Sequence, residues 1–304
     1  MTFVRFFLLL LLMFAACERE HLGQAELPEN WQEDLTEWKQ NRIESLKQPA
    51  GWLRLAGMFE IREGSNSFGS GEGQDLRFPT GSLPDHAGYI FLEENIVTMK
   101  MAEGLQAGAG EKMVAEIILY DGESTPSVTY DSLEWFVIVR QDLIAIRLYN
   151  KENEKADAFD GFPAYPEDPS WVREAIFEPS PEGAVIEIVN VLGQTDRVAS
   201  PGTLHFTVDG KSYSLDALEG TERMFIILGD QTNRTETYQA GRFLYVDYPE
   251  EGSSRTVIDF NKTYNPPCAF NVYTTCQLPP PQNRLDAAVT AGEKRPVGWT
   301  GIEI

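Results

Sequence analysis

The sequence is poor in the residues that most often carry metal binding and catalysis. Its 304 residues include three cysteines and three histidines, and His21, His86 and His205 lie far apart. Zinc motifs need closely spaced residues of these two types, so the sequence indicates no metal site and no cofactor. The short motifs of serine hydrolases, P-loop proteins and dinucleotide-binding proteins are also absent. Enzymes without short motifs, such as glycosidases, stay open.

Basic residues are scarce as well. The chain has 25 Lys and Arg against 47 Asp and Glu, which gives a formal net charge of −22. A surface of this charge repels phosphate backbones, so we expect no nucleic-acid partner. The acidic residues are scattered rather than gathered in one run, which is typical of a solvated surface.

Long apolar runs are missing except near the start of the sequence. An apolar block from Phe6 to Phe14 follows Arg5, and two alanines and Cys17 come next. The block is shorter than the roughly 20 residues that span a bilayer, and its flanks are those of a secretory signal. Small residues directly before a cysteine favour a lipoprotein signal over a plain secretory signal or a short buried helix.

We therefore expect residues 1–16 to be removed as a lipoprotein signal peptide, with Cys17 as the lipidated first residue of the mature protein. Two or more acyl chains give stable anchoring, so the partner that the sequence predicts is a membrane. The protein should be exported and anchored to the cell envelope, facing the periplasm or on the surface of the outer membrane. The sequence indicates no particular protein partner.

One helix precedes a long series of strands in the predicted organisation. Residues 17–28 are short and polar, as in a tether. An amphipathic pattern favours a helix within residues 29–48, with Asn30 as a candidate cap. Trp31 and Trp38 recur at near-helical spacing, and we expect this aromatic face to dock on the rest of the protein.

The remaining sequence predicts an all-β fold of two β-sandwich-like regions. Short runs of β-branched and aromatic residues alternate with turn residues, and Asp209-Gly210 is typical of a two-residue hairpin. An N-terminal β region over residues 49–150 followed by a C-terminal β domain over residues 151–304 fits this pattern, as does one elongated double sandwich. The predicted strands are residues 51–57, 88–92, 96–101, 113–120, 133–141, 143–150, 175–177, 184–191, 203–208, 211–215, 223–228, 241–247 and 255–259.

Part of the first β region weakly resembles a forkhead-associated sandwich. Gly64, Gly69, His86 and Ile90 fall in the order of that family. The Arg with which such domains read phosphothreonine is replaced here by Ser70, so the resemblance does not imply phosphopeptide binding.

The stretch from Asp230 to Lys294 carries the most distinctive residues. It is rich in proline, yet it interleaves charged and amide residues with aromatics, which solvated linkers lack. Long ordered loops are commonly functional. The candidate site residues share a charged, amide or phenol side chain, and they are Arg242, Asp259, Asn261, Tyr264, Asn265, Asn283, Arg284, Glu293 and Lys294.

Three roles stay open for these residues. Arginine forks bind carboxylate or phosphate, so a small polar pocket there would take a polar or anionic ligand such as an acidic sugar or an organic acid. Asp259 or Glu293 would instead be the acid or base of a hydrolase that acts on a carbohydrate or ester. Alternatively, the residues form a structural clasp that satisfies the backbone of an irregular loop. An envelope protein with a binding or scaffolding role is the leading hypothesis, and no residue is assigned as catalytic.

The same stretch resembles a known family. Its segments look like the signature of the bacterial domain-of-unknown-function family numbered 1684, and Gly51-Trp52-Leu53 and Tyr238 to Leu244 also fit that family. Gln277 departs from the pattern, which has Pro at this position. The family has no established activity, so the resemblance implies no reaction. The signature segments are Asp259-Phe260-Asn261, Asn265-Pro266-Pro267-Cys268-Ala269, Asn283-Arg284-Leu285 and Ala291-Gly292-Glu293-Lys294.

Cys268 and Cys276 are the thiols that remain once Cys17 is lipidated. In an exported protein such a pair predicts a disulfide, which would stabilise its loop by about 2–3 kcal/mol. Two buried free thiols and two ligands of a metal site are the alternatives.

Overall fold

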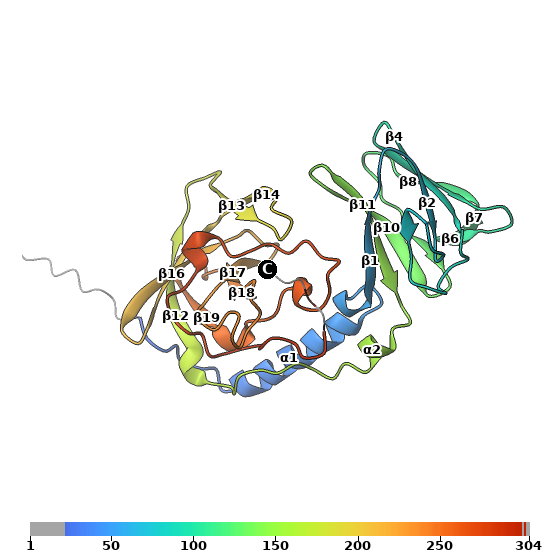
Figure 1. The fold of residues 1–304 in the computed structure, drawn as a ribbon. Helices are drawn as coiled ribbons and strands as arrows, with labels where there is room; N and C mark the ends of the chain where they lie inside the picture. Colours follow the sequence, from blue (N-terminus) through green and yellow to red (C-terminus); the bar gives the residue numbers. More distant parts are fainter. Residues whose placement is uncertain (1–21, 300, 302–304) are drawn as a thin grey trace, which may run out of the picture.

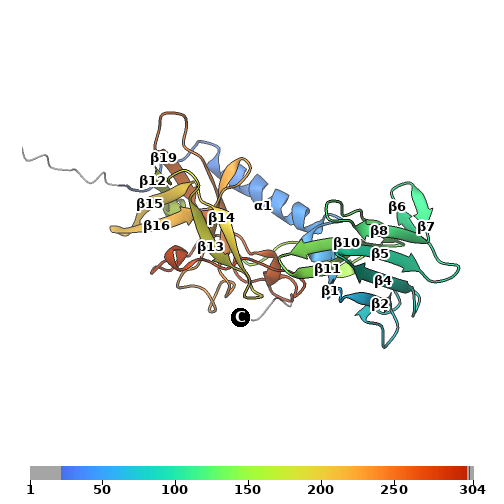
Figure 2. The same cartoon turned by 90° about the horizontal axis from the view of Figure 1, so that it is seen from above.

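The computed structural model describes residues 22–299 and 301, which form two β lobes (Figure 1). The N-terminal lobe spans residues 49–150 and the C-terminal lobe residues 151–299. Figure 2 shows helix α1 (Trp31–Lys47) reaching from one lobe to the other. The predicted signal peptide, Cys17 and the first part of the predicted tether lie outside the described residues. Within the part that is described, no helix is long and apolar enough to cross a membrane.

Residues 22–28 differ from the tether that the sequence predicts. Gln24 forms an isolated antiparallel bridge to β12 (Val172–Pro179), and the Ala25 N–H donates to the carbonyl of Val172 at 2.8 Å. The Ala25 side chain is buried. This short segment is therefore attached to the edge of the C-terminal lobe, because its backbone finds partners there that composition alone does not reveal.

The N-terminal lobe is a sandwich of two sheets around one core. In β10 (Leu133–Arg140), Leu133, Trp135 and Val137 face inward and are buried, since alternate side chains of a strand point to the same side. The Trp135 ring meets Phe78 edge-on, with 5.5 Å between the centroids. One sheet has the order β3 (Leu76–Arg77), β2 (Gly64–Gly69), β4 (Gly88–Glu93), β5 (Ile96–Met101) and β8 (Glu116–Tyr120). The other has the order β1 (Leu55–Glu60), β11 (Leu143–Asn150), β10, β9 (Val128–Tyr130), β6 (Ala107–Ala109) and β7 (Lys112–Val114).

The C-terminal lobe packs a four-stranded sheet against a two-stranded one. Its core lies between them and includes Phe206, Ile226 and Phe260. The large sheet has the order β16 (Lys211–Ala217), β15 (Gly202–Val208), β12 and β19 (Arg255–Asp259). The small sheets are β17 (Arg223–Leu228) with β18 (Arg242–Asp247), and β13 (Val185–Val189) with β14 (Thr195–Ala199). Short 3₁₀ turns at Pro169–Trp171, Phe260–Lys262, Pro267–Ala269 and Pro281–Asn283 interrupt the connecting segments.

Most predicted strands are confirmed to within a few residues, and so is the hairpin at Asp209-Gly210. Both turn residues have positive φ, 50° and 74°, as the favoured two-residue hairpin turn requires. Residues 51–57 begin as a 3₁₀ turn at Trp52–Arg54 before β1, contrary to the prediction. The sequence does not predict β2, β3, β6, β9 or β14. The glycine- and serine-rich β2 is extended because it pairs in register with β4.

Helix α1 docks its two tryptophans on the C-terminal lobe, as predicted. The Trp31 indole N–H donates to Asp259 Oδ2 at 2.9 Å, and the Trp38 ring lies 6.4 Å from the Tyr264 ring. Asn30 is the N-cap residue, as predicted, but its side chain makes no cap hydrogen bond, and its amide donates instead to the carboxylate of Asp34 in the first turn.

Arg54 fixes the other end of the helix to the N-terminal lobe. Its guanidinium donates to the carbonyls of Lys47 and Lys151 and to the carboxylate of Asp157 in α2 (Glu154–Asp157). One side chain thus ties together the end of α1, the start of β1 and the segment that links the lobes.

We expect Gly292→Ala to destabilise the fold more than Gly210→Ala. Both glycines have positive φ, 76° and 74°, so each substitution costs about 1–2 kcal/mol of backbone strain. A Cβ at Gly292 would also overlap the hydroxyl and carbonyl of Thr263, whereas Gly210 has nothing within 4 Å. Overpacking adds about 1–3 kcal/mol at Gly292 alone. Urea unfolding followed by circular dichroism measures the difference, and equal costs would contradict the close approach.

Candidate functional site

Arg242 lies at the centre of the C-terminal signature and is fully buried. Its guanidinium donates to the carbonyls of Val289, Ala291 and Glu293 and to Asp230 Oδ2, the last at 2.9 Å. The other carboxylate oxygen of Asp230 accepts hydrogen bonds from the backbone and hydroxyl of Thr232 and from the backbone of Val289. The arginine therefore holds the segment 289–293 against β18 through its two terminal nitrogens, while its buried Nε has no hydrogen-bond partner within the described residues.

Glu293 extends this arrangement to helix α1. Its carboxylate accepts from Arg42 Nε at 3.3 Å and from the backbone and side-chain N–H groups of Asn265 at 2.7 and 2.9 Å. Burial raises the pKa of Glu293, while the charge of Arg42 and the Asn265 hydrogen bonds act to lower it. Arg42 also lies 4.7 Å from the centre of the Tyr264 ring, whose own pKa is raised by burial.

Two further asparagines satisfy loop backbone in the same manner. Asn261 accepts from the Asp168 N–H and donates to the Asp168 carbonyl, and Asn283 does the same with Asp216. Asp259 accepts from Trp31 and from Asn261. These contacts are those of a structural clasp.

The predicted polar pocket is not formed where the sequence places it. None of the nine candidate residues lines the cleft described below. Arg284 has an exposed side chain, and its backbone pairs with Gly229, while Lys294 forms a half-exposed ion pair with Glu236. The carboxylate oxygens of Asp259 and Glu293 accept hydrogen bonds from other parts of the fold, and neither residue lines the cleft. The clasp is the role that the geometry gives this group of residues, since a long irregular loop must find partners for its backbone.

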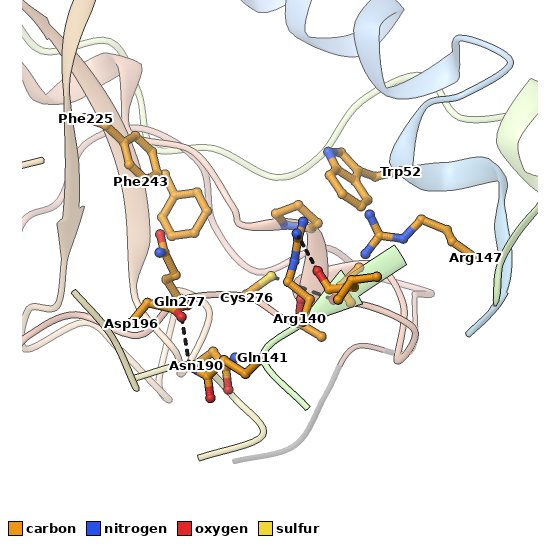
Figure 3. A pocket seen from close by; sticks show the side chains of 14 residues that line it. Trp52, Arg140, Gln141, Arg147, Asn190, Asp196, Phe225, Phe243, Cys276 and Gln277 are labelled. Carbon is orange, nitrogen blue, oxygen red and sulfur yellow. Dashed lines mark hydrogen bonds between the residues drawn. The ribbon is translucent and has the colours of Figure 1, made fainter. Parts of the chain in front are cut away.

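A cleft of about 520 Å³ lies instead between the two lobes (Figure 3). Trp52, Arg140 and Arg147 line it from the N-terminal lobe, and Phe225 and Phe243 from the C-terminal lobe. Residues 274–277 of the signature loop also border it. Its size and its mixture of aromatic and polar walls are those of a small-molecule site.

Arg147 is the unusual group in this cleft. It lies in the middle of β11, its side chain is turned away from the sandwich core, and the residue is only 8% exposed. No carboxylate within residues 22–299 pairs with it, and its Nε has no hydrogen-bond partner. The guanidinium lies 5.4 Å from the Trp52 ring centre and beside Tyr149. Burial lowers the pKa of Arg147, which reflects the cost of holding this charge away from water.

One side of the cleft is closed by two hairpin tips. Gln141, at the turn between β10 and β11, donates to the Thr195 carbonyl at 2.7 Å and to Asp196 Oδ1 at 2.9 Å. Gln194 donates back to the Arg140 carbonyl at 3.4 Å. The exposed side chain of Arg140 thereby lies at the rim of the same cleft as Arg147.

Cys268 and Cys276 are free, buried thiols in the structure, and the predicted disulfide is not present. They are nevertheless in contact, since the Cys268 N–H donates to Cys276 Sγ at 3.0 Å. Among the residues that the structure describes, no three metal-binding side chains gather. Cys276 lines the cleft, whereas Cys268 lies behind it.

The sequence does not single out Arg147, Arg140 or Phe243. The signal that could have found Arg147 is its charge within the otherwise apolar run LIAIRLY, because a charged residue in such a run is rarely buried without a partner. The approach of the two lobes, which places this arginine in the cleft, has no local pattern in the sequence that would predict it.

Removal of the Arg242 guanidinium should destabilise the protein severely. Arg242→Met leaves the buried Asp230 carboxylate without its cation, and breaking such a pair costs about 3–5 kcal/mol. Lys294→Met is the matched control, because its pair with Glu236 is partly exposed and worth about 1 kcal/mol or less. Urea unfolding of both variants tests the clasp, and similar losses would argue against a central role for Arg242.

Three solved structures resemble parts of this chain, each with a low TM-score. An uncharacterized protein from Haloarcula marismortui, solved by NMR, is 30% identical over 47% of this chain and 80% of its own, with a TM-score of 0.39. The FHA domain of FhaA, solved in complex with the intracellular domain of another protein, is 18% identical over 30% of this chain and 85% of its own, with a TM-score of 0.21. An FHA domain from a study of phosphothreonine-dependent interactions is 17% identical, and the match covers 31% of this chain and 85% of that domain, also with a TM-score of 0.21.

No curated protein matches the chain. The match to a protein family covers the signature residues from Arg242 to Lys294 and most of the C-terminal lobe. It does not reach Gly51-Trp52-Leu53, and it confirms the resemblance for the signature: residues 157–294 of this chain belong to the family described as Protein of unknown function (DUF1684).

Proposed function

We propose that the cleft between the lobes binds a small organic anion, with Arg147 as its main charged contact. The observation that carries this proposal is a buried arginine that opens on a cleft and has no carboxylate partner within residues 22–299. A buried charge without a partner is costly, so proteins pair such groups with a counter-ion or a ligand. An anion that enters the cleft would supply that partner.

The rest of the cleft supports a carboxylate carried on a ring or a short hydrocarbon. The guanidinium fork matches the two oxygens of a carboxylate. Trp52, Phe225 and Phe243 offer flat apolar surfaces for the body of the ligand. Asn190 and Gln277 add amide groups at the border, which suits hydroxyl groups of an acidic sugar. Arg140 and Arg147 also give this cleft positive charge in a chain whose net charge is −22, so an anion would be attracted to the cleft and repelled by the rest of the surface.

The binding role is tested by calorimetry with D-glucuronate, benzoate and inorganic phosphate as probes. We expect one of the two carboxylates to bind more tightly than phosphate. Arg147→Gln should weaken that binding about 10- to 100-fold, because a charge-assisted hydrogen bond contributes about 1.5–3 kcal/mol. Arg197→Gln is the control, since it removes the same charge from an exposed position on β14 outside the cleft. Equal affinity of Arg147→Gln and the wild type would contradict the proposal.

We also propose that the protein works in the cell envelope, anchored by a lipid on Cys17. The support is the sequence pattern of Arg5, the apolar block and the small residues before Cys17. A lipid-anchored protein with a polar cleft would bind its ligand outside the cytoplasm.

Metabolic labelling with an alkyne analogue of palmitate tests this location. We expect the full chain expressed in a bacterium to carry the label in the membrane fraction. Cys17→Ser should abolish the label, whereas Cys268→Ser should keep it, because only Cys17 follows the signal pattern. A labelled Cys17→Ser protein or an unlabelled wild type would contradict lipidation at this residue.

A further inference from the structure

The two thiols occupy different positions relative to the cleft. Cys276 is 7% exposed and lines the cleft between Thr275 and Gln277, and Cys268 is fully buried behind it. Besides the N–H of Cys268, the hydroxyl of Thr274 lies 3.7 Å from Cys276 Sγ. Cys276 therefore borders the cleft, although most of its surface is buried, whereas Cys268 does not line the cleft at all.

The surroundings also separate the two thiols electrostatically. Burial raises the pKa of Cys268 far above its usual range. Burial also acts to raise the pKa of Cys276, but hydrogen bonds from Cys268 and Thr274 and the charge of Arg147 outweigh it, so the net shift is downward. The thiolate, which is the nucleophilic form, is thus favoured on the cysteine that borders the cleft.

We infer that Cys276 is a reactive thiol that reduces a small hydroperoxide in the cleft, and that Cys268 then resolves it as a disulfide. Cys276 borders a cleft that also holds a guanidinium without a carboxylate partner in residues 22–299, and a positive charge near a thiol is typical of reactive cysteines. The guanidinium of Arg147 borders the same cleft as Cys276 (Figure 3). In that place it stabilises both the attacking thiolate and the negative charge that develops on the leaving oxygen.

The chemistry balances with the peroxide as the oxidant. The Cys276 thiolate attacks the terminal oxygen of ROOH, an S–O bond forms, the O–O bond breaks, and RO⁻ takes a proton and leaves as ROH. Cys276 is then a sulfenic acid, oxidised by two electrons. The sulfur of Cys268 attacks it, the S–S bond forms and the S–O bond breaks, and the hydroxide leaves as water with the proton of Cys268. An external thiol restores the pair by disulfide exchange.

The full chain, reduced and freed of reductant, is treated with one equivalent of hydrogen peroxide and digested under alkylating conditions. Peptide mass spectrometry then follows Cys268 and Cys276 separately from Cys17. We expect the wild type to lose two hydrogens as a disulfide between Cys268 and Cys276. Cys268→Ser should stop at the sulfenic acid, which dimedone traps on Cys276. Cys276→Ser should leave Cys268 unoxidised.

Arg147→Gln should slow the oxidation of Cys276 several-fold, because it removes a positive charge that lowers the pKa of this thiol and so favours the thiolate. Arg197→Gln should leave the rate unchanged. Circular dichroism checks that each variant is folded. The assay contains no organic anion, so its result does not depend on whether the cleft binds one.

The wild type alone provides a second test that needs no substitution. The alkylation of Cys276 by iodoacetamide should rise with a midpoint below the roughly 8.5 of a free cysteine, and Cys268 should stay unmodified. Dimedone on Cys268 instead of Cys276, retention of both thiols after peroxide, or an alkylation midpoint at or above that of free cysteine would each overturn the inference.

Discussion

The buried guanidinium of Arg242 is the contact on which the C-terminal half of the structure depends. It gathers three backbone carbonyls between Val289 and Glu293 and the carboxylate of Asp230, so a segment without regular structure gains fixed hydrogen-bond partners. Glu293, placed by this contact, orders Asn265 and Arg42 in turn. The loop that follows Asn265 carries both cysteines and forms one border of the cleft. The contacts of Arg242 therefore position the loop that borders the cleft, although Arg242 itself does not line the cleft.

Helix α1 positions the N-terminal lobe, which forms the opposite side of the cleft, without lining the cleft itself. Trp31 fixes its first turn to Asp259 in the C-terminal lobe, and Arg54 fixes its last residues to the N-terminal lobe. The helix sets the spacing of the lobes, and the contact of Gln141 with Asp196 holds them together at the hairpin tips. A long helix with an anchor at each end keeps this spacing more firmly than a flexible linker would, because its length is fixed at 1.5 Å per residue.

Local patterns in the sequence predict elements well and predict the site poorly. The alternating runs on each side of Asp209-Gly210 determine a hairpin, since turn chemistry and strand period act over a few residues. The extended β2 and the attached segment around Gln24 depend on partners far along the chain, so their composition indicates loops. The unusual residues of the signature are correctly singled out, but whether Arg242 binds backbone or ligand depends on what surrounds it, and the sequence cannot supply those surroundings.

Two buried arginines show how such surroundings separate structure from function. Arg242 and Arg147 carry the same charge, and each is at least nine-tenths buried. Arg242 has a carboxylate and three carbonyls, so ligand binding would have to break contacts that hold the fold. Arg147 has an aromatic ring and a phenol beside it and an open cleft in front, and a new anion would relieve its desolvation without displacing any ion pair. The partners of a buried charge, rather than its presence in a distinctive motif, therefore locate the candidate site.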